Sequence, residues 1–280
     1  MEYARTRLGI VLTAAGGQAA LLRLRNLRRK PKLLAATQSK TRLDHFDPVD
    51  PSRFAAVFRE LVKDLPKVVR RADMPVFVSL PDPLVREDVL RFADFPDGVA
   101  EAQDLVRMRL LRETGGAMVD PVCTYEVIDR ADEVTVRVRS LERALRDAIE
   151  QGASAAGLHI TRLESWLGYA SVALGDVAPD GACLFSDGDS WSLTCWAQSV
   201  PEGYFEAGWV ADADDDLGNR IARLIQSFAL AHDASPLTLV GAAPDALVAR
   251  LPGDVVGAIR PGADVFAAAV TPAQGVAQWG

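Results

Sequence analysis

The same order of predicted elements occurs twice in this chain, and that repetition restricts the fold more than any other feature of the sequence. In the first copy, apolar runs predict three strands between residues 8 and 39, joined by a Gly16-Gly17 turn and by the basic stretch 26–32. A helix capped by Ser52 follows, with an apolar face made of Phe54, Val57, Phe58, Leu61, Val62 and Leu65. A buried strand at 75–81 completes a β-β-β-α-β unit.

The second copy lies toward the end of the chain. Strands are predicted at 182–186 and 192–198, around a turn at 187–189, and a third at 204–210. A helix at 217–231 follows four aspartates at 212 and 214–216, and a strand at 236–244 ends in small residues. The aspartates either favour the N-terminus of that helix or bind a divalent cation; the first interpretation is preferred, because the alternating ligand pattern of a calcium loop is missing.

Between the two copies lies a smaller α/β segment. It contains predicted strands at 84–92, 124–129, 133–140 and 158–165, and predicted helices at 98–113 and 141–151, the latter ended by Gly152. The strand at 133–140 alternates, with valines on one face and Thr135, Arg137 and Arg139 on the other. We therefore expect three parts: a first unit at 1–81, an insert at 82–164 and a second unit at 165–280.

Composition excludes several classes of protein. Of the 280 residues, 49% are hydrophobic and 25% charged, which is typical of a folded globular chain. The net charge of −7 gives nucleic acid no reason to bind the protein as a whole. We expect no signal peptide and no membrane span, and three cysteines without metal-ligand spacing indicate a reduced, cytoplasmic protein. No zinc spacing, catalytic triad or dinucleotide fingerprint occurs, so no metal site and no catalytic residue are predicted.

The insert and the strand before it carry a family resemblance. The stretch VFVSLPDPLVREDVLRFADFP at 76–96, followed by the helix GVAEAQDLVRMRLLRE at 98–113, is similar to the PilM-type proteins of type IV pilus assembly. Those proteins run from a "v-SLP-s-v" strand through a strand ending "lP" into an amphipathic helix. The chain also resembles the related cytoplasmic domain of the type II secretion GspL proteins. The resemblance implies an α/β, actin-like (ribonuclease H-like) fold, in which two β-β-β-α-β units face a nucleotide cleft and a 1C-like subdomain is inserted.

The nucleotide loops that this resemblance implies are degenerate here. Actin-like ATPases carry an acid in each of two hairpin loops, which positions magnesium and the attacking water. Val11 stands at the first of these positions and Phe185 at the second, although a slip of one or two residues would promote Asp187. A third stretch with Gly241 and Ala242 matches the family's "LvGGg" adenosine turn, or is an ordinary strand-to-helix junction. The degenerate loops comprise Gly16, Gly17, Asp187, Gly188, Gly241 and Ala242.

These loops lead us to expect no cofactor, with ATP and magnesium as the alternative. Gly16 and Gly17 are interpreted as residues that turn the chain and hold nothing. The carboxylates of Asp187 and Asp189 would repel a phosphate and are interpreted as turn residues at a hairpin tip.

A basic cluster precedes the third strand. Arg28, Arg29, Lys30 and Lys32 either meet an anionic membrane surface or are a solvated hairpin. The sequence leaves these two interpretations open.

The resemblance implies a non-catalytic scaffold of an inner-membrane pilus assembly platform, cytoplasmic and peripheral to that membrane. Its partner would be the cytoplasmic tail of a single-pass membrane protein, docked in a groove between the first subdomain and the insert, and the motor ATPase is a further expected partner. Three alternatives stay open: a GspL-like domain of a type II secretion platform, an active actin-like ATPase or small-molecule kinase, and an unrelated α/β binding module.

Overall fold

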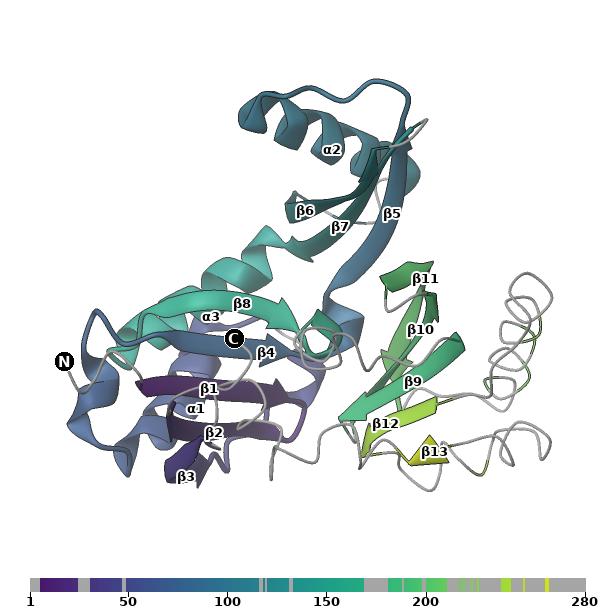
Figure 1. Ribbon diagram of the computed structural model, residues 1–280. Helices are drawn as coiled ribbons and strands as arrows, with labels where there is room; N and C mark the ends of the chain where they lie inside the picture. The colour runs from purple at the N-terminus through teal and green to yellow at the C-terminus, as the bar shows by residue number, and fades with distance from the viewer. Residues whose placement is uncertain are drawn as a thin grey trace.

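The computed structural model contains two five-stranded sheets and one three-stranded sheet (Figure 1). It describes residues 6–24, 31–46, 49–115, 118, 120–130, 133–168, 181–187, 189–197, 200–210 and 238–242, and the isolated positions 217, 219, 223, 226, 249 and 260–261. The basic residues Arg28, Arg29 and Lys30 and the turn residue Gly188 lie outside this description, as do the aspartates at 212–216.

The first sheet has the strand order β3-β2-β1-β4-β8. The first three strands form two antiparallel hairpins, and β4 and β8 extend the sheet in parallel. The strands are β1 (Thr6–Thr13), β2 (Gly16–Arg23), β3 (Lys32–Gln38), β4 (Val76–Leu80) and β8 (Ile160–Ser165). The apolar sequences of β1, β2 and β4 are almost wholly buried, because the sheet forms the centre of the largest hydrophobic core found among the described residues.

The second sheet repeats this arrangement in the order β11-β10-β9-β12-β13, again with two antiparallel pairs followed by parallel strands. Its strands are β9 (Gly181–Asp187), β10 (Ser190–Ala197), β11 (Val200–Trp209), β12 (Thr238–Ala242) and β13 (Arg260–Pro261). The matching order and direction confirm the repeated unit that the sequence predicts. Within the predicted helix 217–231, the four described positions are helical, and Leu217 is buried.

Helix α1 (Pro51–Lys63) covers the first sheet through the predicted apolar face. Phe54, Val57, Phe58 and Leu61 are at most 1% exposed. The predicted cap is wrong by two residues: Asp50 is the N-cap, and its Oδ1 accepts a hydrogen bond from the Ser52 amide at 2.8 Å. Pro51 favours this start, because proline suits the first helical position, where its missing N–H is not needed.

Helix α3 (Arg143–Ala155) corrects a second prediction. Leu141 and Glu142 end strand β7, and the helix continues beyond Gly152, which the sequence had suggested as its end. A Cβ atom at Gly152 would lie 2.5 Å from the Phe54 Cβ and 2.8 Å from the Ala55 amide nitrogen of α1. The glycine therefore permits the close crossing of α1 and α3 and does not terminate the helix.

The insert is shorter than the expected range 82–164. Its sheet has the order β5-β7-β6 and consists of β5 (Arg86–Phe92), β6 (Pro121–Arg130) and β7 (Val134–Glu142), covered by α2 (Val99–Glu113). Helix α3 packs in the core of the first sheet, and β8 pairs with β4, so both belong to the first unit. The insert therefore spans about 86–142. It stands above the first sheet, and the second sheet lies beside the first sheet (Figure 1).

Candidate functional site

The first hairpin tip, at Ala14 and Ala15 between β1 and β2, is one of the predicted nucleotide loops. The two glycines that follow this tip, Gly16 and Gly17, lie where a side chain would not fit. Gly16 has φ +135, and a Cβ there would lie 2.7 Å from the Thr41 carbonyl oxygen. A Cβ at Gly17 would lie 3.0 Å from side-chain carbons of Val57 and Leu61 in α1. Close packing and backbone conformation thus account for both glycines without a phosphate.

The segment 39–41 that lies against this tip is fixed by Glu60 of α1. The carboxylate of Glu60 accepts hydrogen bonds from the Ser39 hydroxyl (2.7 Å), the Lys40 amide (2.7 Å) and the Thr41 amide (3.1 Å). The hydrogen bond from Ser39, followed by those from Lys40 and Thr41, lowers the pKa of Glu60 to about 2 from its usual 4.5.

The two positions at which the resemblance implies acids are buried and apolar. Val11 is 3% exposed and packs with Ala20, Phe77 and Trp166. Phe185 in β9 is fully buried. Burial disfavours an ionised carboxylate unless it is paired, so a valine and a phenylalanine suit these two buried positions.

The other predicted loop residues gather near the second hairpin tip. Gly241 and Ala242 end strand β12, where they pair with Ser186 and Asp187 of β9. On the other side of that tip, the Oδ2 atom of Asp189 accepts a hydrogen bond from the Ala15 amide at 3.2 Å. The fold therefore brings the three predicted loops to one place, and a carboxylate of the second tip binds an N–H of the first.

Lys32, by contrast, is separate from these loops. It lies at the start of the edge strand β3, pairs with Arg23 of β2 and is exposed.

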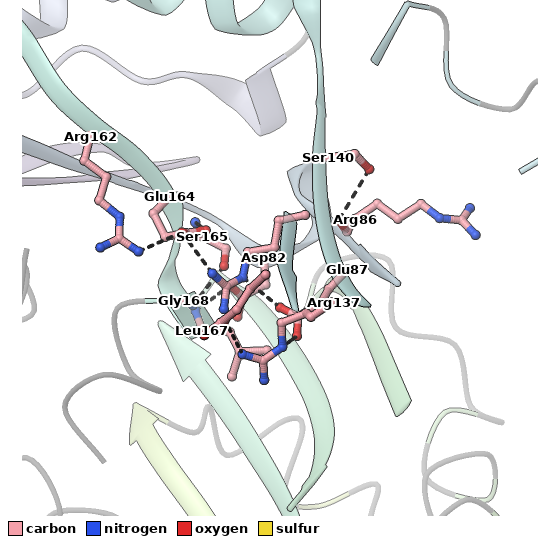
Figure 2. A network of polar contacts seen from close by, with 12 residues as sticks. Asp82, Arg86, Glu87, Arg137, Ser140, Arg162, Glu164, Ser165, Leu167 and Gly168 are labelled. Carbon is pink, nitrogen blue, oxygen red and sulfur yellow. Dashed lines mark hydrogen bonds and ion pairs between the residues drawn. The ribbon is translucent and has the colours of Figure 1, made fainter. Parts of the chain in front are cut away.

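A buried ion-pair network joins the insert to the first sheet, and sequence reasoning missed it. Glu87 of β5 lies between two arginines of β7, with Oε1 2.9 Å from Arg137 Nε and Oε2 3.2 Å from Arg139 Nε. Glu164 of β8 lies 3.3 Å from Arg139 Nη1 and 3.2 Å from Arg162 Nη2. Figure 2 shows Glu87 with Arg137, and Glu164 with Arg162.

Burial and neighbouring charges shift the pKa values of the two arginines of β7 in opposite directions. Desolvation lowers the pKa of Arg137 and outweighs its neighbouring carboxylates. Desolvation also lowers the pKa of Arg139, but Glu164 and Glu87 outweigh it and leave the pKa raised. The alternation of β7 placed both arginines on one face, but their partners Glu87 and Glu164 come from strands distant in the sequence.

Asp82 connects all three parts of the molecule and is only 1% exposed. It begins the short 3-10 helix η4 (Asp82–Leu84) that leads from β4 into the insert. Its Oδ1 accepts a hydrogen bond from the Leu167 amide at 2.8 Å, after β8, and its Oδ2 accepts one from the Ser192 hydroxyl of β10 at 2.6 Å. A buried carboxylate needs such partners, so Asp82 fixes the root of the insert against both sheets (Figure 2). In the sequence, the signal for this role of Asp82 is its position directly after the buried strand VFVSLP.

Among the described residues, two of the cavities border the insert. One, of about 130 Å³, separates the insert from the first unit and is lined by Leu80, Leu163, Val122, Thr124, Arg139 and Glu150, among others. We call this cavity the insert groove. The other, of about 480 Å³, lies at the root of the insert and is lined by Asp82, Arg86, Glu142, Leu145 and, from the second sheet, Ala207. The insert groove combines aliphatic walls with charged groups of both signs.

Within the described part of the chain, no three histidine, cysteine, aspartate or glutamate residues are placed to share a metal ion. The helices found there are too short or too polar to cross a membrane.

Known proteins share the architecture but little sequence. No family model matches the chain, and no curated protein does. A chain of a PilM–PilN type IV pilus biogenesis complex is 16% identical, with a TM-score of 0.70 over 97% of this chain and 90% of that one. The cytoplasmic domain of EpsL, an inner-membrane component of the type II secretion system of Vibrio cholerae, is 12% identical, with a TM-score of 0.53 over 98% and 93%. The resemblance to PilM-type proteins is thus confirmed at the level of the fold: the chain has an actin-like α/β fold with an inserted subdomain.

Proposed function

We propose that this protein is a non-catalytic scaffold of a pilus or secretion assembly platform, working in the cytoplasm at the inner membrane. Its task in this proposal is to dock the short cytoplasmic tail of a single-pass membrane partner, and through that complex to reach the motor ATPase. The likeness to a chain of a PilM–PilN complex over almost the whole length supports this role. The likeness to the EpsL cytoplasmic domain supports a second candidate, a role in a type II secretion platform.

The insert groove is the observation that carries the docking proposal. Its first-unit wall comes from Leu80 of β4 and Leu163 of β8, and β8 is an edge strand of its sheet. Its insert wall comes from Val122 and Thr124 of β6, also an edge strand. A groove between two sheet edges suits an extended peptide, which exchanges main-chain hydrogen bonds with an edge and places alternate side chains in the pocket.

The charged residues at the groove give it a preference among peptides. Two arginines and two glutamates line the groove. Arg139 lies 3.3 Å from Glu164, and Arg146 of α3 lies 3.1 Å from Glu150, so each charge has an opposite charge beside it. Charged groups across an interface fix register and exclude wrong partners more than they add affinity. The tail that docks here therefore carries an apolar side chain for the aliphatic walls, and polar groups beside it that do not oppose these ion pairs.

The non-catalytic part of the proposal is supported by the two loops. Val11 and Phe185 occupy the positions where an actin-like ATPase carries the acids that organise magnesium and water. The Ala15 amide, which would face a phosphate oxygen, donates to Asp189 in this structure.

The test is binding of a tail peptide to a protein whose groove has been filled. The probe is a synthetic peptide of the cytoplasmic tail of a single-pass pilus or secretion protein from the same organism, titrated by calorimetry. Thr124 is exposed and lines the groove, so Thr124→Trp should block it without unfolding the sheet and weaken binding at least about tenfold. Gln38→Trp is the matched control, because Gln38 is exposed on β3, at the opposite edge of the first sheet.

Equal affinity of the wild-type protein and the Thr124→Trp protein would show that the tail does not occupy the insert groove. Absence of binding to the wild-type protein would remove the docking function itself.

A further inference from the structure

Besides the contact between Asp82 and Ser192, the two sheets meet at a second junction, which the docking role does not use. We call the first sheet with α1, α3 and the Leu43–Phe46 segment the first lobe, and the second sheet the second lobe. The interlobe junction consists of Ala15 and Phe46 from the first lobe and Asp189 and Trp209 from the second. One half of this junction is polar and the other is aromatic.

The polar half joins the two hairpin tips. The Ala15 amide donates a hydrogen bond to the Asp189 carboxylate at 3.2 Å, across 174 positions of sequence. Ala15 itself is exposed, so its amide would meet water or a bound anion if the carboxylate moved away. A hydrogen bond that uses an ionised acceptor is stronger than one between neutral groups.

The aromatic half joins the end of β11 to the core of the first lobe. The rings of Phe46 and Trp209 are stacked with their centroids 6.3 Å apart and their planes at 24°. Phe46 is 3% exposed and also lies 5.8 Å from the ring of Phe54 in α1. Trp209 therefore packs onto the hydrophobic core of the other lobe, at a place where burial of aromatic surface favours closure.

The two halves are linked within each lobe, so they act as a unit. In the second lobe, the Val210 amide donates to the Asp189 carbonyl at 2.9 Å, and Trp209 is the residue before Val210. In the first lobe, the Ala14 carbonyl accepts hydrogen bonds from the amides of Leu43 (3.0 Å) and Asp44 (3.1 Å), two residues before Phe46. A displacement of one half must therefore strain or displace the other.

We infer that the interlobe junction is a built-in latch that keeps the two lobes closed. The Asp189 carboxylate binds the Ala15 amide, where an anionic ligand could otherwise bind, and Trp209 packs against Phe46. In a two-lobed protein whose halves meet at hairpin tips, an anionic ligand bound between the tips would join the lobes in the same way. Here the Asp189 carboxylate of the chain itself is the anion at the Ala15 amide.

The latch is tested by amide exchange at Ala15, followed by NMR in the full-length protein. Asp189→Ala should accelerate exchange of the Ala15 amide by about tenfold, because a charge-assisted hydrogen bond is lost. Trp209→Leu should accelerate the same amide although Trp209 lies in the aromatic half, and leucine preserves an apolar residue at this half-buried position. Asp104→Ala is the matched control, since Asp104 is an exposed aspartate on α2.

Unchanged exchange in Asp189→Ala would overturn the polar half of the latch. If Asp189→Ala accelerates exchange but Trp209→Leu does not, the contact is local and the two halves do not act together, which also contradicts the proposal. The NMR spectrum of each variant shows whether the remaining amides keep their folded positions, so loss of the fold would be recognised separately.

Discussion

Replacement of Gly152 by alanine would test the close crossing of α1 and α3, on which the placement of the insert depends. Two effects of opposite sign compete at this position. Alanine in place of glycine inside a helix stabilises by about 1 kcal/mol, because glycine loses more backbone entropy. The added methyl group would lie 2.5 Å from the Phe54 Cβ and 2.8 Å from the Ala55 amide nitrogen.

The steric effect should win, because neither contacted atom can move by rotating a side chain. One is a Cβ atom and the other belongs to the backbone of α1, so the two helices must separate. Overpacking a core in this way costs about 1–3 kcal/mol, occasionally more. Contacts of 2.5 and 2.8 Å to atoms of the α1 backbone and its Cβ place this site in the upper part of that range, at about 2–3 kcal/mol. After the gain in propensity is subtracted, we expect Gly152→Ala to lower the free energy of unfolding by roughly 1–2 kcal/mol.

Urea denaturation at constant pH measures this difference, with Ser154→Ala as the control. Ser154 is exposed on the same helix, so its replacement changes propensity without adding volume to the crossing. Ser154→Ala should be neutral or slightly stabilising. A Gly152→Ala protein as stable as the wild type, or more stable, would refute the close approach of α1 and α3 at this glycine.

Three further outcomes are expected. Because its folded-state pKa is lowered to about 2, Glu60 adds stability that is complete above pH 4.5 and is lost as the pH falls toward 2. Glu60→Gln should therefore flatten the fall of the urea midpoint between these pH values, and identical slopes would contradict the hydrogen bonds assigned to Glu60. Calorimetry with magnesium-ATP should detect no binding tighter than about millimolar, roughly 4 kcal/mol, whereas low-micromolar binding abolished by Asp187→Ala would restore the ATPase alternative. Changing Arg28, Arg29 and Lys30 together to glutamate should weaken salt-sensitive binding to anionic vesicles while leaving thermal stability nearly unchanged; equal vesicle binding would leave a solvated hairpin.

The sequence alone determined the order of elements and the buried face of the main helix. The apolar spacing from Phe54 to Val62 is a local property of α1, because one helical face repeats every three to four residues whatever lies against it. The same applies to β7, whose alternation placed Arg137 and Arg139 on one side of the strand. Such patterns record which side is buried, and their order along the chain was sufficient to indicate the repeated unit. The resemblance to PilM-type proteins rested instead on the residues of the stretches 76–96 and 98–113.

Only the tertiary structure decided which partners those faces meet. Strand β8 has an ordinary strand sequence. Nothing in that sequence shows that the strand pairs with β4 and so belongs to the first sheet instead of the insert. Gly152 has the sequence context of a helix end, but its role comes from Phe54, nearly a hundred positions earlier. The contact between Asp189 and Ala15 and the two bonds of Asp82 likewise join segments distant in the chain. Periodicity encodes exposure within one element, whereas register, crossing and charge pairing depend on where the other elements lie, and that information is absent from any local window of sequence.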